Sequence, residues 1–141
     1  MVFGAITVDV LLTLQNAEIT KSTTSSDEGN QVLRQPDFQA RIAPSYDFTA
    51  GDWDGTVYAA FTMVDDRWGD NGNTVKLPSY EKFDVGVLLY HDSGFFFQLH
   101  GDNVNDSDGI TEGDPRNPSA PNGRPIFGTS WRFSVGYDFG D

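Results

Sequence analysis

Residues 131–139 read WRFSVGYDF, and this stretch decides how the rest of the sequence is interpreted. Every second residue is apolar, and polar residues or glycine stand between. The apolar members are Trp131, Phe133, Val135, Tyr137 and Phe139. Because side chains of a β-strand point alternately to the two faces of a sheet, this period predicts a strand with one apolar face. That face is nearly all aromatic, so we expect it to lie against hydrocarbon or a partner.

Five earlier segments show the same alternation. They cover residues 3–20, 38–48, 56–68, 82–89 and 95–100. Pro44 interrupts the second segment, and because proline has no N–H to donate, it predicts a bulge or a local gap in pairing. No segment has the period of an amphipathic helix. We therefore expect an all-β chain, an antiparallel up-and-down meander of about six long strands.

The connections between these segments alternate between long and short. Polar stretches at 21–30, 69–74 and 101–125 read as long loops, and 49–54 and 91–94 read as short turns. Several predicted strands have about 10 residues or more, whereas globular strands have nearer 5 or 6 and a tilted membrane-crossing strand needs about 9–11. Long loops at one end and short turns at the other are typical of outer-membrane β-barrels.

Composition excludes several classes of protein. With 21 acidic and 9 basic residues the formal charge is -12, which argues against nucleic acid as a partner held by electrostatics. The chain has no cysteine, which excludes disulfides and thiolate metal sites. It has no apolar run long enough for a membrane helix. The sequence begins without a recognisable leader, which fits either a cytosolic protein or a piece of something longer.

Candidate catalytic and metal-binding residues are few. No nucleophile or phosphate-binding motif is present, so we expect no enzyme activity and no cofactor. His91 and His100 lack a third ligand for zinc. The loop at 102–114 holds acidic and amide residues that suit Ca²⁺, but the EF-hand spacing fails and a solvated loop is the favoured interpretation. Its oxygen-bearing residues are Asp102, Asn103, Asn105, Asp106, Asp108, Glu112 and Asp114.

Several short motifs, taken in order, resemble the C-terminal part of the barrel of a TonB-dependent outer-membrane receptor. They are LTLQNAEITKS at 12–22, QPDF at 35–38 with YDF at 46–48, LPSY at 77–80 with FDVG at 83–86, FQL at 97–99 with DNVND at 102–106, and FG at 127–128 leading to Phe139. Ser79 stands where the family commonly has glycine. Together the motifs span almost the whole chain.

This resemblance implies a segment of a large transmembrane β-barrel for energised uptake of a scarce nutrient: an iron chelate, a cofactor or a glycan. Residues 1–141 would be the last six strands, without the plug domain or the segment that binds TonB. The implied partners are the remaining barrel strands and plug, outer-membrane lipid, the barrel-assembly machinery and, through the plug, TonB. The implied location is the bacterial outer membrane, with the three long loops extracellular.

The resemblance also implies roles for individual residues. The terminal strand resembles the signal by which outer-membrane barrels are recognised for assembly, carried here by Phe133, Val135, Tyr137 and Phe139; the alternative is a lipid-facing strand with aromatics at the interface. Polar residues on the other face either contact substrate and plug or pair with one another. These are Arg41, Asp84, Gln98, His100 and Arg132. Trp53, Trp68 and Trp131 suit aromatic girdles. The lipid-facing residues would be Phe83, Val85, Val87, Leu89, Phe95, Phe97 and Leu99.

Two other architectures fit the same alternation. One is a soluble β-sandwich that binds a ligand such as a carbohydrate, and the other is a small self-contained or oligomeric barrel. A sandwich would bury the apolar faces of two sheets against each other, whereas a barrel wall would leave them without protein cover. The exposure of these faces therefore separates the alternatives.

Overall fold

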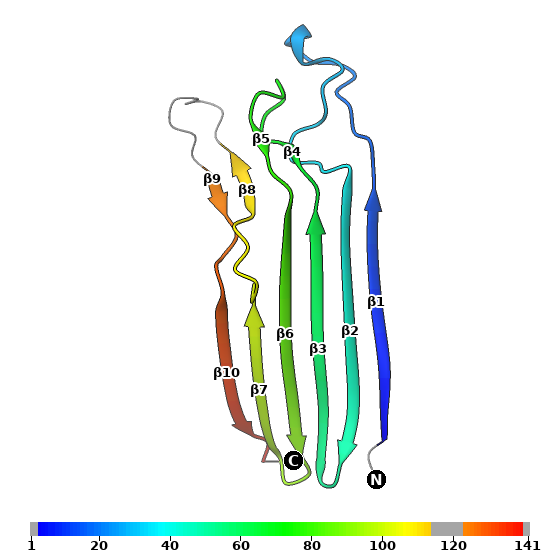
Figure 1. Cartoon of the computed structure of the whole chain (residues 1–141), viewed down its shortest axis with the longest axis vertical. Helices are drawn as coiled ribbons and strands as arrows, with labels where there is room; N and C mark the ends of the chain where they lie inside the picture. Colours follow the sequence, from blue (N-terminus) through cyan, green and yellow to red (C-terminus); the bar gives the residue numbers. More distant parts are fainter. Residues whose placement is uncertain (1–2, 114–122, 140–141) are drawn as a thin grey trace.

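The computed structural model describes residues 3–113 and 123–139 and shows one long, single-layered sheet (Figure 1). Six antiparallel strands form it in the order β1-β2-β3-β6-β7-β10. Their bounds are β1 Phe3–Leu14, β2 Phe38–Ala50, β3 Trp53–Val64, β6 Tyr80–His91, β7 Phe95–Asp102 and β10 Ser130–Tyr137. Each strand pairs with the next long strand along the chain, so the predicted up-and-down meander is confirmed.

The two ends of the sheet differ as the sequence predicts. The connections from β1 to β2, β3 to β6 and β7 to β10 are long and gather at one end, while the turns β2–β3 and β6–β7 lie at the other (Figure 1). The long connections are not irregular throughout. One contains the 3-10 turn η1 (Ser25–Asp27), and two contain small ribbons: β4 (Arg67–Trp68) with β5 (Lys76–Leu77), and β8 (Ile110–Gly113) with β9 (Gly123–Pro125).

Two strands are shorter than the sequence predicted. The first ends at Leu14 rather than at residue 20, and the third ends at Val64 rather than at Trp68. The reason is shared: β2, which lies between them, begins only at Phe38, opposite Leu14 on one side and next to Gln39, the partner of Val64, on the other. Beyond that point neither strand has a partner in the six-stranded sheet; residues 67–68 instead form β4, which pairs with β5.

Pro44 produces a local gap in pairing, one of its two predicted effects. On the β1 side the ladder runs through Pro44, which lies opposite Val8. On the β3 side the pairs step from Ile42 directly to Ser45, with the same register on both sides of the gap. The gap arises because proline has no N–H for the ladder, and the unchanged register shows that no bulge forms.

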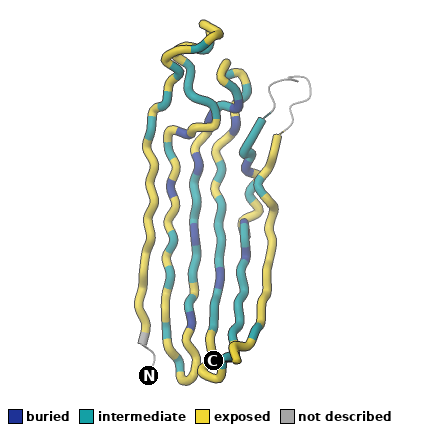
Figure 2. The backbone as a smooth tube through the Cα atoms, turned by 180° about the vertical axis from the view of Figure 1, so that it is seen from behind, coloured by how far each residue is buried: buried dark blue, intermediate teal, exposed yellow. Residues whose placement is uncertain are grey.

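One face of the sheet is apolar and has no second protein layer over it in the described part of the chain. Val57 is 46% exposed, Phe95 52% and Val135 65%. Figure 2 shows half-buried residues along the central strands and exposed ones along β1 and β10. The sandwich alternative is therefore wrong, because it needs a second sheet against this face. β1 and β10 are the two sheet edges and do not pair with each other, so the described chain does not close into a barrel by itself.

Asn103, at the end of β7, fixes the start of the longest connection. Its side chain is 0% exposed and donates to the carbonyl oxygens of Ser107 (3.0 Å) and Phe127 (2.9 Å), while its own carbonyl oxygen accepts from the Ser107 N–H (2.9 Å). Thr129 Oγ1 donates to the Asn103 main-chain oxygen at 2.7 Å. Asn103 has φ 51°, a left-handed conformation that asparagine tolerates better than most residues. The asparagine thus joins both ends of the connection.

We expect Asn103→Gly to destabilise the folded state by about 1–3 kcal/mol, because buried carbonyl and N–H groups lose their partners. Glycine accepts the positive φ, so the substitution removes the side-chain bonds without adding backbone strain. Asp106→Gly is the matched control, since Asp106 also has positive φ but makes exposed bonds of 3.3–3.4 Å. Urea unfolding followed by tryptophan fluorescence measures both variants. An equal shift in midpoint for the two would contradict the role assigned to Asn103.

Candidate functional site

The alternation of side chains is in phase across all six strands, which gives the sheet two chemically different faces. Residues that lie opposite one another on successive strands form a row across the sheet. One such row is apolar, and the row one residue further along the strands points to the other face. The apolar row is Ile6, Tyr46, Val57, Val87, Leu99 and Phe133. The neighbouring row is Thr7, Ser45, Tyr58, Gly86, His100 and Arg132.

The seven residues expected to face lipid all lie on the apolar face. Phe83, Val85, Val87 and Leu89 come from β6 and Phe95, Phe97 and Leu99 from β7. Phe95 is exposed and the other six are half-buried, because each is flanked by side chains of adjacent strands. The most exposed part of this face is elsewhere, on edge strand β1, where Ile6 is 76% exposed. The alternation of apolar and polar residues at 6–14 is the sequence pattern that predicts an apolar face on this strand.

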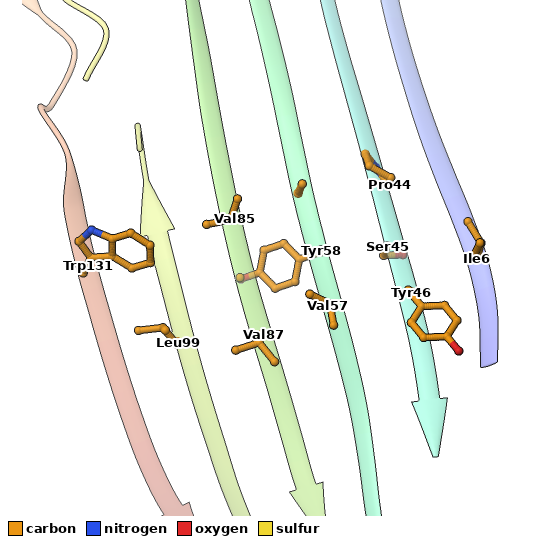
Figure 3. A pocket seen from close by; sticks show the side chains of 12 residues that line it. Ile6, Pro44, Ser45, Tyr46, Val57, Tyr58, Val85, Val87, Leu99 and Trp131 are labelled. Carbon is orange, nitrogen blue, oxygen red and sulfur yellow. The ribbon is translucent and has the colours of Figure 1, made fainter. Parts of the chain in front are cut away.

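A shallow hollow of about 650 Å³ lies on the same face. Ile6 and Tyr46 stand on one side of it and Leu99 and Trp131 on the other (Figure 3). The small side chain of Ala59 also lines it. Trp131 covers Gly101 of β7, where a Cβ atom would collide with the indole ring. Trp131 therefore packs against β7 on the apolar face of the sheet. Trp53 lies next to the β2–β3 turn, and Trp68 lies in the β4–β5 ribbon under Lys76.

The four residues of the predicted assembly signal do not share one element. Phe133, Val135 and Tyr137 lie in β10, whereas Phe139 follows its end. Edge-to-face ring contacts join Phe133 to Phe97, and Tyr137 to both Phe95 and Phe139, with ring centroids 4.7–4.9 Å apart. The Asp138 N–H donates to the Gly94 carbonyl oxygen at 2.8 Å. These contacts fasten the last strand to the β6–β7 hairpin.

Ion pairs and hydrogen bonds, within and between strands, organise the polar face. Lys82 Nζ lies 3.0 Å from an Asp84 carboxylate oxygen and 2.8 Å from one of Asp102. Asp84 also accepts the Asn103 N–H at 2.8 Å. Towards the short turns, hydroxyl groups donate to carboxylates: Thr56 to Asp47 at 2.6 Å and Thr49 to Asp54 at 2.7 Å. Most acids of this face are therefore already hydrogen-bonded within the sheet.

The structure brings three of the five predicted polar residues together. Gln98, His100 and Arg132 line a pocket of about 250 Å³ with Tyr58 and Ser134. The Tyr58 hydroxyl lies 3.0 Å from His100 Nδ1. The other two predicted residues lie apart from it: Asp84 pairs with Lys82, and Arg41 lies opposite Thr62 in the β2–β3 ladder.

Tyr58 reaches His100 because the residue between them is glycine. Tyr58 on β3 pairs with Gly86 on β6, which in turn pairs with His100 on β7. A Cβ atom at Gly86 would collide with the phenol ring, which crosses β6 at this point (Figure 3). An aromatic ring that covers a glycine of a neighbouring strand protects the exposed backbone. The tyrosine was not singled out from the sequence, because its pairing with Gly86 depends on the register between β3 and β6.

The acidic loop uses its oxygens for protein contacts. Asp102 binds Lys82, Asp106 accepts from Thr129, and the two Glu112 carboxylate oxygens lie 3.1 Å from Arg34 and 3.2 Å from Arg124. Asp114, the last of the candidate calcium ligands, lies outside the described residues. The two histidines considered for zinc lie on opposite faces of the sheet, since His91 shares the row of Trp53 and His100 that of Tyr58.

Side-chain hydrogen bonds join the long connections to one another. Asn73 Oδ1 accepts the Gln31 N–H at 2.9 Å, and Asn73 Nδ2 donates to the Gln31 carbonyl oxygen at 3.0 Å. The Arg67 guanidinium, 5% exposed, donates to the Ile110 carbonyl oxygen at 2.7 Å and packs over the Tyr80 ring. We call this set of connections the loop tier: residues 15–37, 65–79, 103–113 and 123–129.

Asp70 organises the turn of the loop tier between β4 and β5. Its carboxylate accepts the N–H groups of Thr74 and Val75, at 3.0 and 2.8 Å, and the Thr74 hydroxyl at 2.8 Å. Burial by itself raises the pKa of Asp70, but these hydrogen bonds outweigh it, so the pKa lies below its ordinary value. The folded turn therefore favours the ionised carboxylate.

Comparison with known proteins decides the family. The model of the family described as TonB dependent receptor-like, beta-barrel matches residues 3–105. The chain belongs to this family. Members are receptors and transporters of the bacterial outer membrane and not a family of enzymes. In the residues that the structure describes, no helix is both long and apolar enough to cross a membrane.

A solved structure shows the same fold. The crystal structure of BauA, the ferric preacinetobactin receptor from Acinetobacter baumannii, matches with a TM-score of 0.79 at 20% sequence identity. The match covers 94% of this chain and 20% of that receptor. The chain therefore spans about a fifth of the length of that receptor.

We expect the β4–β5 turn to loosen in acid. Because the Asp70 pKa is lower in the folded turn than in the unfolded chain, its stabilisation is present above about pH 3.9 and is lost as the pH falls through the folded pKa. Hydrogen exchange of the Thr74 and Val75 amides, corrected for the intrinsic rate, measures this. Asp70→Asn should exchange faster at neutral pH and show no such acid transition; unchanged protection in that variant would contradict the assignment.

Proposed function

We propose that this chain forms the C-terminal part of the barrel wall of a TonB-dependent receptor, which takes up a scarce nutrient across the bacterial outer membrane. The observation that carries the proposal is the in-phase, two-faced sheet whose apolar face has no protein layer over it. Hydrocarbon can cover that face without hydrogen bonds, and the polar face then lines the interior. The remaining barrel strands and a plug would be supplied by sequence outside this chain.

Strand length supports a membrane-spanning role. β1, β3 and β6 have 12 residues each and β2 has 13, against the roughly 9–11 that a tilted strand needs to cross the hydrocarbon. Trp53, Phe95 and Tyr137 lie near the short turns, as expected of an aromatic girdle at one interface. We assign the short turns to the periplasm and the loop tier to the outside, which is the usual asymmetry of these barrels.

Both edges of the sheet need partners in such a membrane. The outer backbone groups of β1 and β10 have no neighbouring strand in the described chain, and an unpaired N–H or C=O in hydrocarbon costs several kcal/mol. We propose that further barrel strands pair with both edges and close the wall, as in receptors with about 22 strands. Outer-membrane lipid would then cover Phe83, Val85, Val87, Leu89, Phe95, Phe97 and Leu99.

The transported nutrient is an iron chelate, a cofactor or a glycan in this proposal. The similarity to a protein named as a ferric preacinetobactin receptor favours an iron chelate among the three. Selection of the nutrient would rest on the loop tier together with the plug, because those parts face the outside. TonB would act through the plug.

A paired substitution on β6 tests the wall assignment. We expect Val87→Arg, in the full-length receptor that carries this segment, to destabilise the inserted barrel by about 2–4 kcal/mol, because it places a charge on the lipid face near the middle of the strand. Leu88→Arg is the matched control: the adjacent residue is also apolar but points to the polar face. Resistance of the folded barrel to SDS at rising temperature, in outer-membrane fractions, measures both.

The proposal fails if the two arginine variants behave alike, since the two faces would then not differ in solvent. It also fails if the wild-type receptor is monomeric and cooperatively folded in buffer without detergent. Uptake of a labelled ferric chelate by cells with and without the receptor tests the iron-chelate assignment separately from the wall.

We also propose that the end of β10 serves as the assembly signal, through Phe133, Val135, Tyr137 and Phe139. Tyr137 contacts two other rings and Phe139 is 90% exposed, so the last aromatic is free of neighbours on most of its surface. An exposed aromatic just beyond the last strand is available to a recognition partner before the barrel closes.

We expect Phe139→Ala to slow insertion several-fold while leaving the SDS resistance of receptor that has already assembled unchanged, because the residue lies outside the ladder. Pulse-labelling of the receptor, followed by its appearance as the SDS-resistant form, measures the rate. Phe127→Ala is the control, since Phe127 is 88% exposed and lies in the loop tier. Equal rates for both variants would mean that the terminal aromatic carries no signal.

A further inference from the structure

The pocket beneath Tyr58 on the polar face is rich in hydrogen-bond donors. The phenol is a stronger acid than a neutral imidazole, so we assign its O–H as the donor to His100 Nδ1, 3.0 Å away. A neutral His100 then carries its proton on Nε2, which makes that nitrogen a donor as well. Ser134 and Gln98 add a hydroxyl and an amide at the wall of the same pocket. The pocket therefore suits an anion better than a cation.

Arg132 supplies a full positive charge to this pocket. It pairs in register with His100 and lines the pocket beside it. An arginine stays protonated under all physiological conditions, and its planar guanidinium binds a carboxylate with two parallel hydrogen bonds. Within the described residues, no acid forms an ion pair with Arg132. Three acids of this face are bound elsewhere, Asp84 and Asp102 by Lys82 and Asp47 by Thr56.

The position and size of the pocket limit what can occupy it. Tyr58 and Gly86 lie near the middle of their strands, well below the loop tier at which a nutrient would arrive. The volume of about 250 Å³ admits one side-chain carboxylate rather than a bulky chelate. The chain has a net charge of -12, so its field repels free anions, whereas a carboxylate already attached to a neighbouring protein segment avoids the entropy cost of capture.

We propose that the pocket formed by Tyr58, Gln98, His100, Arg132 and Ser134 holds an Asp or Glu carboxylate of the protein segment that fills the barrel interior. This inference rests on the proposed function, because only a closed barrel has an interior. The contact would fasten the filling segment to β7 and β10, near the seam where the last strand meets strands from outside this chain. Tyr58 acts as a positioning residue, since it fixes the orientation of the His100 ring.

The test compares substitutions at two arginines in the full-length receptor. We expect Arg132→Gln to increase protease cleavage of the interior segment about tenfold at intermediate urea, the size expected for loss of one charge-assisted hydrogen bond. Arg132→Lys should restore part of the protection. Arg41→Gln is the matched control, because Arg41 lies on the same face but outside the pocket. SDS resistance of the barrel should stay the same in all three variants.

Photo-cross-linking identifies the occupant directly. A benzoylphenylalanine in place of Ser134 should cross-link to a peptide of the interior segment that contains Asp or Glu, whereas the same replacement at Val135, on the opposite face, should not. Equal cleavage in the Arg132→Gln and Arg41→Gln variants would overturn the proposal. So would a loss of ferric-chelate affinity with an unchanged interior, which would assign the pocket to the nutrient. A wild-type receptor that never becomes SDS-resistant would instead contradict the proposed function, and the inference would fall with it.

Discussion

The two faces of this sheet depend on one constraint, the common register of six antiparallel strands. Since side chains alternate with a period of two, a slip of one residue between any two strands would move apolar side chains to the polar face. Here every ladder keeps the phase: Val57 lies opposite Val87, which lies opposite Leu99. Even the gap at Pro44 leaves the register unchanged. The uncovered apolar face, the paired acids and the donor-rich pocket all follow from that phase.

The interactions that fix the register differ between the two ends of the sheet. At the short turns, little more than hairpin geometry is needed, and Gly51 and Gly94 supply the positive φ that tight turns require. At the other end the connections are long, so closing them costs more chain entropy. Asn103 offsets part of that cost with its buried hydrogen bonds, and Asp70 does the same for a smaller turn. The loop tier is therefore a hydrogen-bonded structure around the buried side chain of Leu77.

Alternation alone was sufficient to predict the six long strands, their order and the face of their apolar residues, because it is a local property of the sequence. It did not predict the short strands β4, β5, β8 and β9. Strand ends were harder to predict. Residues 15–20 alternate well enough, but the strand stops at Leu14 because its partner β2 begins only at Phe38, a fact that no local pattern contains. The pocket was missed for a similar reason. Gln98, His100 and Arg132 were named individually, whereas their assembly with Tyr58 depends on the register across three ladders.

Because the Tyr58 ring lies against Gly86, the space for a side chain at this position of β6 depends on a residue of β3. The ring occupies the space that a side chain on β6 would fill, so the residue allowed at 86 is set by the residue at 58. The same holds for Trp131 with Gly101. We therefore expect substitutions at such positions to be coupled: a side chain at the glycine fits only where the aromatic ring has been replaced by a smaller residue. Gly86 and Gly101 thus mark positions at which a neighbouring strand supplies the side-chain volume, so that each position is filled by a pair of residues from two strands.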